Sequence, residues 1–248
     1  MIPYPELYAK TKIYGKNEIN IPTKKRDYIA HAVRGKTVLH VGCTDSPITE
    51  ENHKRGGLLH SALCGSASEV TGIDLCEKGI DFLEKNGFSR LHVMDAEKMS
   101  FDRKFDVIVA GDLVEHLSNP GLFLKQVPGL LNPHGKLIIT VPHAYSGYWA
   151  KSMWRRHHEI VNKDHCCYYS PKTLAALCGR FDLLPVGLRY LFGGTRSWKG
   201  KIVDRIPGMR KFVNWCRSQP TSPLMADHFL MTFMVKDDID PNTTCYEI

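Results

Sequence analysis

The stretch Phe105–His143, FDVIVAGDLVEHLSNPGLFLKQVPGLLNPHGKLIITVPH, contains one complete repeat unit of an α/β protein. The apolar run at Asp106–Ala110 predicts a buried strand, and apolar residues at helical spacing predict a helix over Pro120–Leu131. The Pro and Gly of Asn132–Lys136 predict a turn, and Lys136–Val141 is a second apolar run. A strand, a crossover helix and a strand in this order predict two parallel strands of one sheet.

The same alternation continues in both directions along the chain. Helical spacing in Gly57–Ala67 and Glu77–Lys85 separates further short apolar runs. Helices on both faces of a right-handed parallel arrangement predict a doubly wound, mostly parallel sheet. No clear crossover helix precedes the final strand, so we expect it to be antiparallel. The predicted strands are Thr37–Val41, Val70–Asp74, Arg90–Met94, Asp106–Ala110, Lys136–Val141, Leu183–Tyr190 and His228–Val235.

Length and composition fit one soluble globular domain over residues 1–248, with 43% hydrophobic and 24% charged residues. No window holds the run of about 18 apolar residues that a membrane span needs, and the N-terminal residues lack the core of a secretory signal. We therefore expect a cytoplasmic protein. The eight cysteines include no CxxC pair, which favours reduced thiols over disulfides or a zinc site. Residues 1–34 are expected to form an N-terminal helical cap.

Most of the positive charge is concentrated in one segment. The whole chain has a net charge of +7, and Thr195–Pro220 carries seven Lys or Arg against Asp204 alone, which is +6. We expect this basic, amphipathic insertion between the last two strands to form a lid over the acceptor. Contact with a membrane surface, or with a phosphorylated glycan- or lipid-linked acceptor, is the alternative. One short patch does not favour nucleic acid. His157 and His158, in the basic stretch KSMWRRHHEI, are expected to be solvated.

Polar residues follow three consecutive predicted strands, where open α/β sheets bind their ligands. Gly42 follows the first strand, Asp74 ends the second and Asp95 follows the third. A carboxylate in the position of Asp74 accepts hydrogen bonds from ribose hydroxyls, and Asp95 can accept one from an adenine amino group. Leu75 and Met94 can flank the ring. These residues predict a nucleoside pocket, although Asp74 lies 32 positions after Gly42 because a polar loop, TDSPITEENHKRGG, intervenes.

The segments VLHVGC, VTGIDL, HVMDAEKM, Phe105–His143 and DHCCYYSPKTLAAL together resemble the class I S-adenosylmethionine-dependent methyltransferases. The likeness is to the branch of ubiquinone-pathway O-methyltransferases and of methyltransferases from bacterial glycan and natural-product clusters. It covers residues 35–190 and the last strand, and it implies a seven-stranded sheet and S-adenosylmethionine as cofactor, with S-adenosylhomocysteine as product. The cofactor-binding residues implied are Gly42, Cys43, Thr44, Asp45, Ser46, Asp74, Leu75, Asp95, Ala96, Gly111, Asp112 and His116.

The first motif departs from the pattern of that family. The family has an acid where His40 stands and glycines where Thr44 and Ser46 stand. Thr and Ser adopt positive φ less freely than Gly. We therefore predict a remodelled loop in which the side chains of Thr44, Asp45 or Ser46 replace backbone contacts to the methionine moiety. The GxGxxG turn of NAD-binding proteins is absent, which does not favour a dehydrogenase.

A hydroxyl acceptor must lose its proton during methyl transfer, and a base with a pKa near the working pH serves that purpose. Imidazole has such a pKa. The candidate catalytic residues are therefore His143 and His165, together with Glu115. An alternative is that these residues bind Mg²⁺, Mn²⁺ or Zn²⁺. Their spacing is not a recognised metal motif, so we expect no metal. The residues that could gather around such an ion are Asp112, Glu115, His116, His143 and His165.

The sequence therefore predicts an S-adenosylmethionine-dependent methyltransferase that acts by in-line displacement on a hydroxyl of a sugar, a glycan precursor or a related small metabolite. The first alternative is an N- or C-methyltransferase of a small natural product, because an acceptor amine needs no histidine base. The second is a non-catalytic module that binds the nucleoside. Neither the acceptor nor the oligomeric state follows from the residues.

Overall fold

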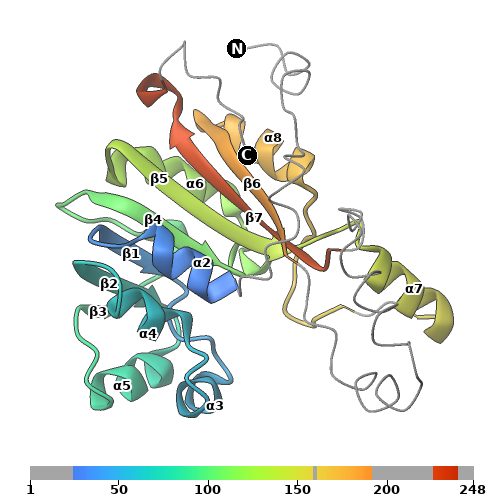
Figure 1. The fold of residues 1–248 in the computed structure, drawn as a ribbon, viewed down its shortest axis with the longest axis horizontal. Helices are drawn as coiled ribbons and strands as arrows, with labels where there is room; N and C mark the ends of the chain where they lie inside the picture. The colour runs from blue at the N-terminus through green and yellow to red at the C-terminus, as the bar shows by residue number, and fades with distance from the viewer. Residues whose placement is uncertain (1–24, 159–160, 192–225, 240–248) are drawn as a thin grey trace, which may run out of the picture.

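The structure is a computed structural model of the chain, and it describes residues 25–158, 161–191 and 226–239. These residues form a seven-stranded sheet in the order β3-β2-β1-β4-β5-β7-β6 (Figure 1). The pairs among β1 to β5 are parallel, whereas β7 lies between β5 and β6 and is antiparallel to both. The predicted fold is confirmed. The insertion predicted at 195–220, and the cap predicted at 1–34 up to residue 24, lie outside the described residues.

The strands follow the predicted apolar runs closely. The first and last have the predicted bounds, and the third is the shortest because only three of its residues pair with β2. The strands are β1 (Thr37–Val41), β2 (Glu69–Asp74), β3 (Leu91–Val93), β4 (Phe105–Gly111), β5 (Leu131–Pro142), β6 (Leu183–Leu191) and β7 (His228–Val235).

The start of β5 differs from the prediction. Leu131 already pairs with Phe105, and pairing then stops and resumes where Lys136 lies opposite Val107. His134, in between, has a φ of 60°. The predicted turn is therefore an irregularity within a longer strand, because the chain leaves the ladder for a few residues and returns to the same neighbour.

Seven described helices and three 3₁₀ turns connect the strands. The helices are α2 (Lys25–Ala32), α3 (Thr49–Lys54), α4 (Leu59–Cys64), α5 (Glu77–Lys85), α6 (Pro120–Leu130), α7 (Gly147–Arg156) and α8 (Pro171–Gly179). The 3₁₀ turns are η1 (Ala96–Lys98), η2 (Val114–His116) and η4 (Lys236–Asp238). None of the described helices has the length and apolar composition of a membrane span.

The prediction of a loop between β1 and the first crossover helix was wrong in part. The polar segment contains α3, and the helix predicted over Gly57–Ala67 is the shorter α4. In α3, Glu50 pairs with Lys54 and Glu51 with Arg55 at i,i+4 spacing. The acids lie in the first turn, where the helix dipole favours them. A polar stretch thus forms a helix through its charge pattern and not through an apolar stripe.

Helices cover both faces of the sheet, and adjacent strand residues face opposite layers. Val38 and Val109 pack in a cluster with α2 and α4, whereas Leu39 and Ile108 pack in another with α6 and α8. Because β1 to β4 are parallel, the residues that follow them lie along one edge of the sheet. This edge is where the candidate site is found.

Candidate functional site

Two features define the backbone of the loop after β1: the positive φ of Gly42 and the hydrogen bonds that join the loop to β2. Gly42 has a φ of 76°, which favours glycine, and a Cβ there would lie 3.1 Å from Leu113 Cδ1, so the space is also tight. The amides of Gly42 and Cys43 donate to the carbonyl of Ile73, which ties the loop to β2. The other positive φ of the loop is at Asp45 (54°), and not at the two positions where the family has glycine. Asp tolerates this conformation better than most residues.

Thr44 fastens the loop to the carboxylate of Asp74. Its amide and its hydroxyl donate to Asp74 Oδ2 at 3.0 and 2.8 Å, and the amide of Cys76 donates to Oδ1 at 2.9 Å. A carboxylate accepts about four hydrogen bonds, so Asp74 keeps about one acceptor position for a ribose hydroxyl. Thr44 is fully buried. Its side chain therefore orients Asp74 and is not exposed toward a ligand.

Two other residues predicted to contact the cofactor are buried, which limits their contact with a ligand. Cys43 is fully buried, and Ala96 is 7% exposed. Neither side chain is therefore exposed toward a ligand. Leu75, in contrast, is 69% exposed directly after Asp74, and Ser46 is exposed. Asp95 caps η1 by accepting from the amide of Glu97.

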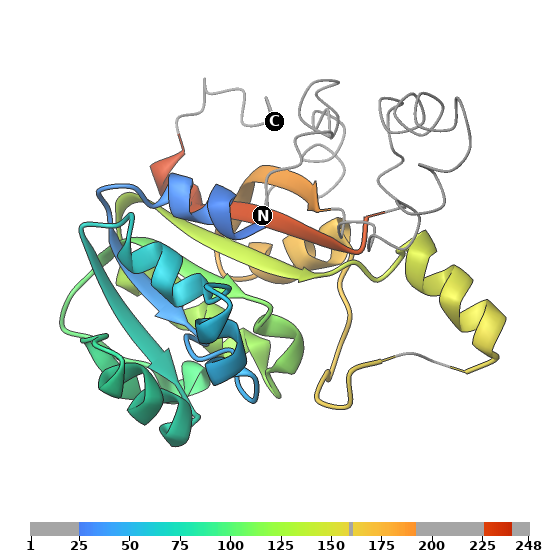
Figure 2. The ribbon, with the colours of Figure 1, turned by 60° about the horizontal axis from the view of Figure 1, so that its bottom comes forward.

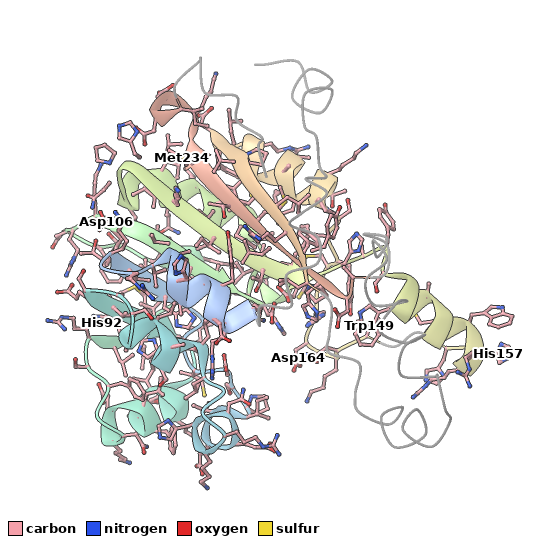
Figure 3. The ribbon with its side chains drawn as sticks, viewed as in Figure 1. His92, Asp106, Trp149, His157, Asp164 and Met234 are labelled. Carbon is pink, nitrogen blue, oxygen red and sulfur yellow. The ribbon has the colours of Figure 1, made fainter. Side chains whose placement is uncertain are left out.

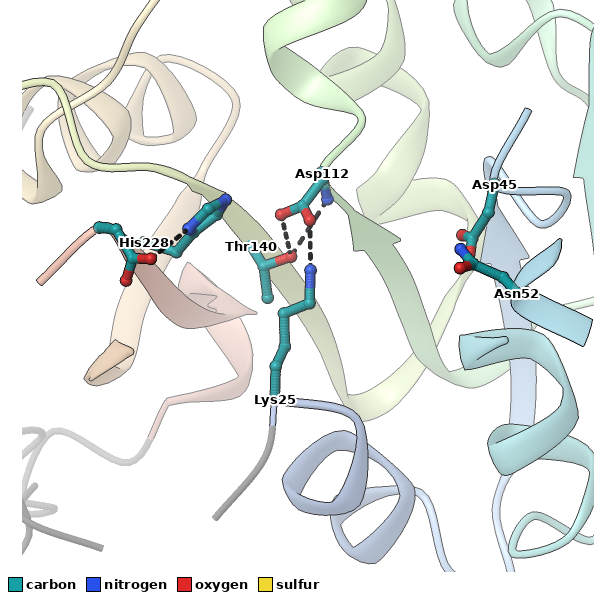
Figure 4. A network of polar contacts seen from close by, with 7 residues as sticks. Lys25, Asp45, Asn52, Asp112, Thr140 and His228 are labelled. Atoms are coloured by element: carbon teal, nitrogen blue, oxygen red, sulfur yellow. Dashed lines mark hydrogen bonds and ion pairs between the residues drawn. The ribbon is translucent and has the colours of Figure 1, made fainter. Parts of the chain in front are cut away.

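A second group of charges surrounds Asp112 at the end of β4 (Figure 4). Lys25 forms an ion pair with Asp112 Oδ2, and the hydroxyl of Thr140 donates to Oδ1 at 2.8 Å. Burial alone would raise the pKa of Asp112, but Lys25, His228 and these hydrogen bonds hold it below its ordinary value. Asp112 is thus ionised and lies beside the ammonium group of Lys25.

Asp45 links the first loop to this group. Asn52 donates to its carboxylate at 3.1 Å. Burial raises the pKa of Asp45, and the charges of Asp112 and Asp74 raise it further, while Lys25 lowers it. Because β1 lies between β2 and β4 in the sheet, the ends of these three strands are neighbours along one edge.

Glu115, His116 and His165 form a cluster after the end of β4. One ligand atom of each lies within 4.8 Å of the others, and the two imidazole rings meet edge to face with centroids 4.5 Å apart. The amide of Cys166 donates to the carbonyl of Glu115 at 2.8 Å, which holds the loop before α8 against η2. The carbonyl of Asp164 and the hydroxyl of Tyr168 lie at hydrogen-bond distance from Nδ1 of His116 and of His165, respectively.

Glu115 is fully buried, and neither carboxyl oxygen has a hydrogen-bond partner among the described residues. Burial, reinforced by the charge of Asp112, raises the pKa of Glu115 to about 8. Burial and the field of His116 lower the pKa of His165. At neutral pH the site therefore presents a protonated carboxyl beside a neutral imidazole. A carboxyl and two imidazoles are also a donor set that suits a divalent cation.

Of the five residues that could gather around an ion, the structure brings together Glu115, His116 and His165. Asp112 is instead paired with Lys25. His143 is 3% exposed, and its ring contacts those of Tyr145, Tyr190 and Phe229. Burial lowers its pKa. These contacts favour a structural role for His143, and its catalytic role stays a prediction.

Three contributors to the site were not predicted from the sequence. Lys25 precedes the first strand, Thr140 lies within β5 and His228 begins β7. A basic residue ahead of the first strand, and a Thr in an otherwise apolar strand, are weak signals by themselves. Only the crossing of α2 over β4 brings Lys25 to Asp112.

His40, at the position where the family has an acid, forms a pair with His60 of α4. Both imidazoles are buried, with Nδ1 atoms 3.1 Å apart and nearly parallel rings. Burial lowers both pKa values, that of His60 to about 4. Two neutral imidazoles can share one hydrogen bond, with one as donor and the other as acceptor. His40 thus joins β1 to α4 and serves a structural purpose rather than a role at the strand ends.

This geometry agrees with what known proteins show. Residues 17–186 match the family described as Methyltransferase domain. The chain belongs to the class I S-adenosylmethionine-dependent methyltransferase family. Two structures carry the same fold: a methyltransferase of Clostridium acetobutylicum (TM-score 0.54, 11% identity, 94% of this chain and 98% of that one) and one of Archaeoglobus fulgidus (0.52, 17%, 84% and 90%).

The curated relatives match this methyltransferase over a smaller part of the chain. Ubiquinone biosynthesis O-methyltransferase of Coxiella burnetii is 31% identical over 123 residues, 47% of this chain and 48% of that protein. The enzyme of that name from Bordetella avium is 23% identical over 178 residues, 65% of this chain and 67% of that protein. This methyltransferase chain thus spans about half the length of the first of these relatives.

The residues at the strand ends fit S-adenosylmethionine. Asp74 has an acceptor position for a ribose hydroxyl, and the exposed Leu75 lies beside it. Lys25 and Asp112 present one positive and one negative charge, which complement the carboxylate and the ammonium of a methionine moiety. We expect the four residues to hold the adenosine at one end of the site and the amino-acid group at the other.

Proposed function

We propose that this chain methylates a hydroxyl group of a small acceptor, with the acceptor bound against Glu115 and His165. The observation that carries the proposal is the buried carboxyl of Glu115 beside the two imidazoles, with no hydrogen-bond partner in the part of the chain that the structure describes. Two curated relatives are named as O-methyltransferases, which supports oxygen as the methylated atom. S-adenosylmethionine supplies an activated methyl group, so the protein must align the acceptor and remove its proton.

His165 accepts that proton in this proposal. Its lowered pKa keeps the imidazole neutral at pH 7, and Tyr168 occupies only Nδ1. The acceptor proton moves to the free nitrogen of His165, and the imidazolium that forms lies within reach of a carboxyl oxygen of Glu115 that can accept a hydrogen bond from it. Glu115 keeps its own proton, and His165 releases the acceptor proton to solvent after the methylated product and S-adenosylhomocysteine leave.

The acceptor class expected from the sequence was a sugar, a glycan precursor or a related metabolite, and the names of the relatives add an aromatic hydroxyl to the compounds worth assaying. The test is turnover of S-adenosylmethionine to S-adenosylhomocysteine with catechol-type and sugar-type acceptors. We expect Glu115→Gln and His165→Asn to lower kcat by about 100-fold or more while the Kd of the cofactor changes little. Glu50→Gln, an exposed acid on α3, is the control.

If both variants keep full turnover, neither Glu115 nor His165 is the general base. Methylation of an acceptor on nitrogen or carbon would contradict the proposal of a hydroxyl acceptor. Binding of the cofactor with no turnover of any acceptor would favour a nucleoside-binding module. Dialysis against a chelator, followed by Mg²⁺, Mn²⁺ or Zn²⁺, tests the cation. Activity that is lost and then restored by one metal would assign the three side chains to that ion.

A further inference from the structure

Helix α7 projects from the body of the molecule. Figures 1 and 2 show it beyond the end of the sheet, in two views turned by 60°. None of its side chains that the structure describes is buried. Trp149 lies at the end of α7 nearer the sheet, and His157 lies just past the outer end (Figure 3). A helix of 10 residues is marginal without packing, so a surface that covers it would stabilise it.

The sequence of α7 is amphipathic. Trp149, Ala150, Met153 and Trp154 are spaced i, i+1, i+4 and i+5, which places them on one side of a helix. Trp154 is 78% exposed, the largest value among the large hydrophobic side chains that the structure describes as exposed. A largely exposed Trp near the outer end of a projecting helix is unfavourable in water. It is favourable at a membrane interface, where the indole ring contacts both lipid and water.

Charge identifies the kind of surface that α7 fits. The stretch Gly147–His158 contains Lys151, Arg155 and Arg156 and no Asp or Glu, which is a formal charge of +3. Arg155 and Arg156 are exposed and follow Trp154 in the last turn of α7. A Trp next to cationic residues is complementary to an anionic lipid headgroup layer, which accepts the ring below the headgroups and the guanidinium groups at the phosphates.

The position of α7 relates this surface to the site. It follows β5 on the edge of the sheet at which the strands β1 to β4 also end. Tyr145, in the connection, is 65% exposed. An amphipathic surface at this edge, next to the acceptor side, brings the site close to any membrane on which α7 lies.

We propose that α7, through Trp154, Arg155 and Arg156, docks on the surface of an anionic membrane. The interaction is peripheral and reversible. It is distinct from the contact expected for Thr195–Pro220, because it rests on a different segment, and it does not depend on which acceptor is methylated. Trp154 enters the interface, and the arginines at the same end of the helix contact phosphates.

The experiment is co-sedimentation of the full chain with vesicles of phosphatidylcholine alone or with 30% phosphatidylglycerol added. We expect binding to the anionic vesicles that weakens at high salt, because screening shortens the reach of the charges. Trp154→Ala and the double variant Arg155→Gln/Arg156→Gln should each lower the partition coefficient by about tenfold. Far-UV circular dichroism and the melting temperature should stay unchanged for both, since none of the three side chains is buried.

Matched controls come from other exposed sites. Leu122→Ala removes a 41% exposed apolar side chain of α6, and Lys54→Gln/Arg55→Gln removes two exposed cations at the end of α3. Both should bind the anionic vesicles like the unchanged chain. The proposal is overturned if the chain binds neither vesicle, if it binds both equally, or if the α7 variants bind as well as the controls. The last result would place the membrane contact in another segment.

Discussion

Thr44 shows how a side chain can take over a task that glycine performs in related loops. Its amide and hydroxyl both donate to Asp74, while the positive φ of the loop moves to Asp45. That side chains of this loop replace backbone contacts to a methionine moiety stays a prediction. The side chain acts on the carboxylate of Asp74, however, because Thr44 is buried and does not reach the ligand side.

Glu115 predicts an unusual dependence of stability on pH. Its pKa is raised in the folded chain to about 8 from an ordinary 4.5, so the folded state holds a proton that the unfolded state has lost in this range. The contribution is fully present below pH 4.5 and is lost as the pH rises through 8. Glu115→Gln should therefore be more stable than the unchanged chain at pH 9, by on the order of a few kcal/mol, and nearly equal at pH 4.5.

Urea denaturation at several pH values measures this difference. His40 and His60 lose stability in the opposite direction, as the pH falls below about 6.5, because their folded pKa values are lowered. Both variants share this second dependence, so it cancels in the comparison. A Glu115→Gln variant with the same pH profile as the unchanged chain would show that the carboxyl has a partner or a lower pKa.

At the scale of elements, α5 packs unusually close to the loop after β1. A Cβ at Gly79 would lie 2.7 Å from Cβ of Thr44 and 2.8 Å from its Cγ2. The helix can therefore approach the loop only because position 79 lacks a side chain. If position 44 were glycine, a side chain at position 79 would not meet the side chain of Thr44. The sizes of the residues at positions 44 and 79 are therefore coupled.

We expect Gly79→Ala to destabilise the chain by roughly 1–3 kcal/mol through overpacking, although alanine favours a helix. Thr44→Gly should relieve the clash, so the double variant should be more stable than the sum of the two single effects predicts. Thermal or urea denaturation of the four proteins gives this coupling energy. Additive effects would mean that the helix shifts away from the loop at little cost.

At the scale of the whole molecule, residues distant in sequence lie along one edge of the sheet. Lys25, Asp74 and Asp112 belong to different elements, yet Lys25 and Asp112 form an ion pair and both influence Asp45. A ligand that contacts all of them should stabilise the folded chain. S-adenosylhomocysteine at 100 times its Kd should add about 2.7 kcal/mol to the free energy of unfolding.

Differential scanning calorimetry with and without S-adenosylhomocysteine measures this stabilisation. Asp74→Ala should abolish the increase in Tm, because it removes the ribose acceptor and releases Thr44. Asp81→Ala, an exposed acid on α5, should keep it. An increase of equal size in Asp74→Ala would place the nucleoside elsewhere along the edge.

The order of the elements could be predicted because each strand is a short apolar run and each crossover helix has its own spacing. The bounds of β1, β7 and α5 were correct for this reason. Helix α3 was missed because its stability comes from ion pairs and charge placement and not from an apolar stripe. The start of β5 was missed because its pairing crosses a Pro- and Gly-containing stretch that locally indicates a turn.

The sequence by itself determined the family, the sheet and the strand ends that carry Gly42, Asp74 and Asp95, since these follow from local patterns and from the direction of parallel strands. Only the tertiary structure decided which side chains meet there. Lys25 reaches Asp112, and Glu115 joins His116 and His165, because separate segments cross at the edge of the sheet. Such contacts depend on distances between segments far apart in the chain, and local periodicity carries no information about those distances.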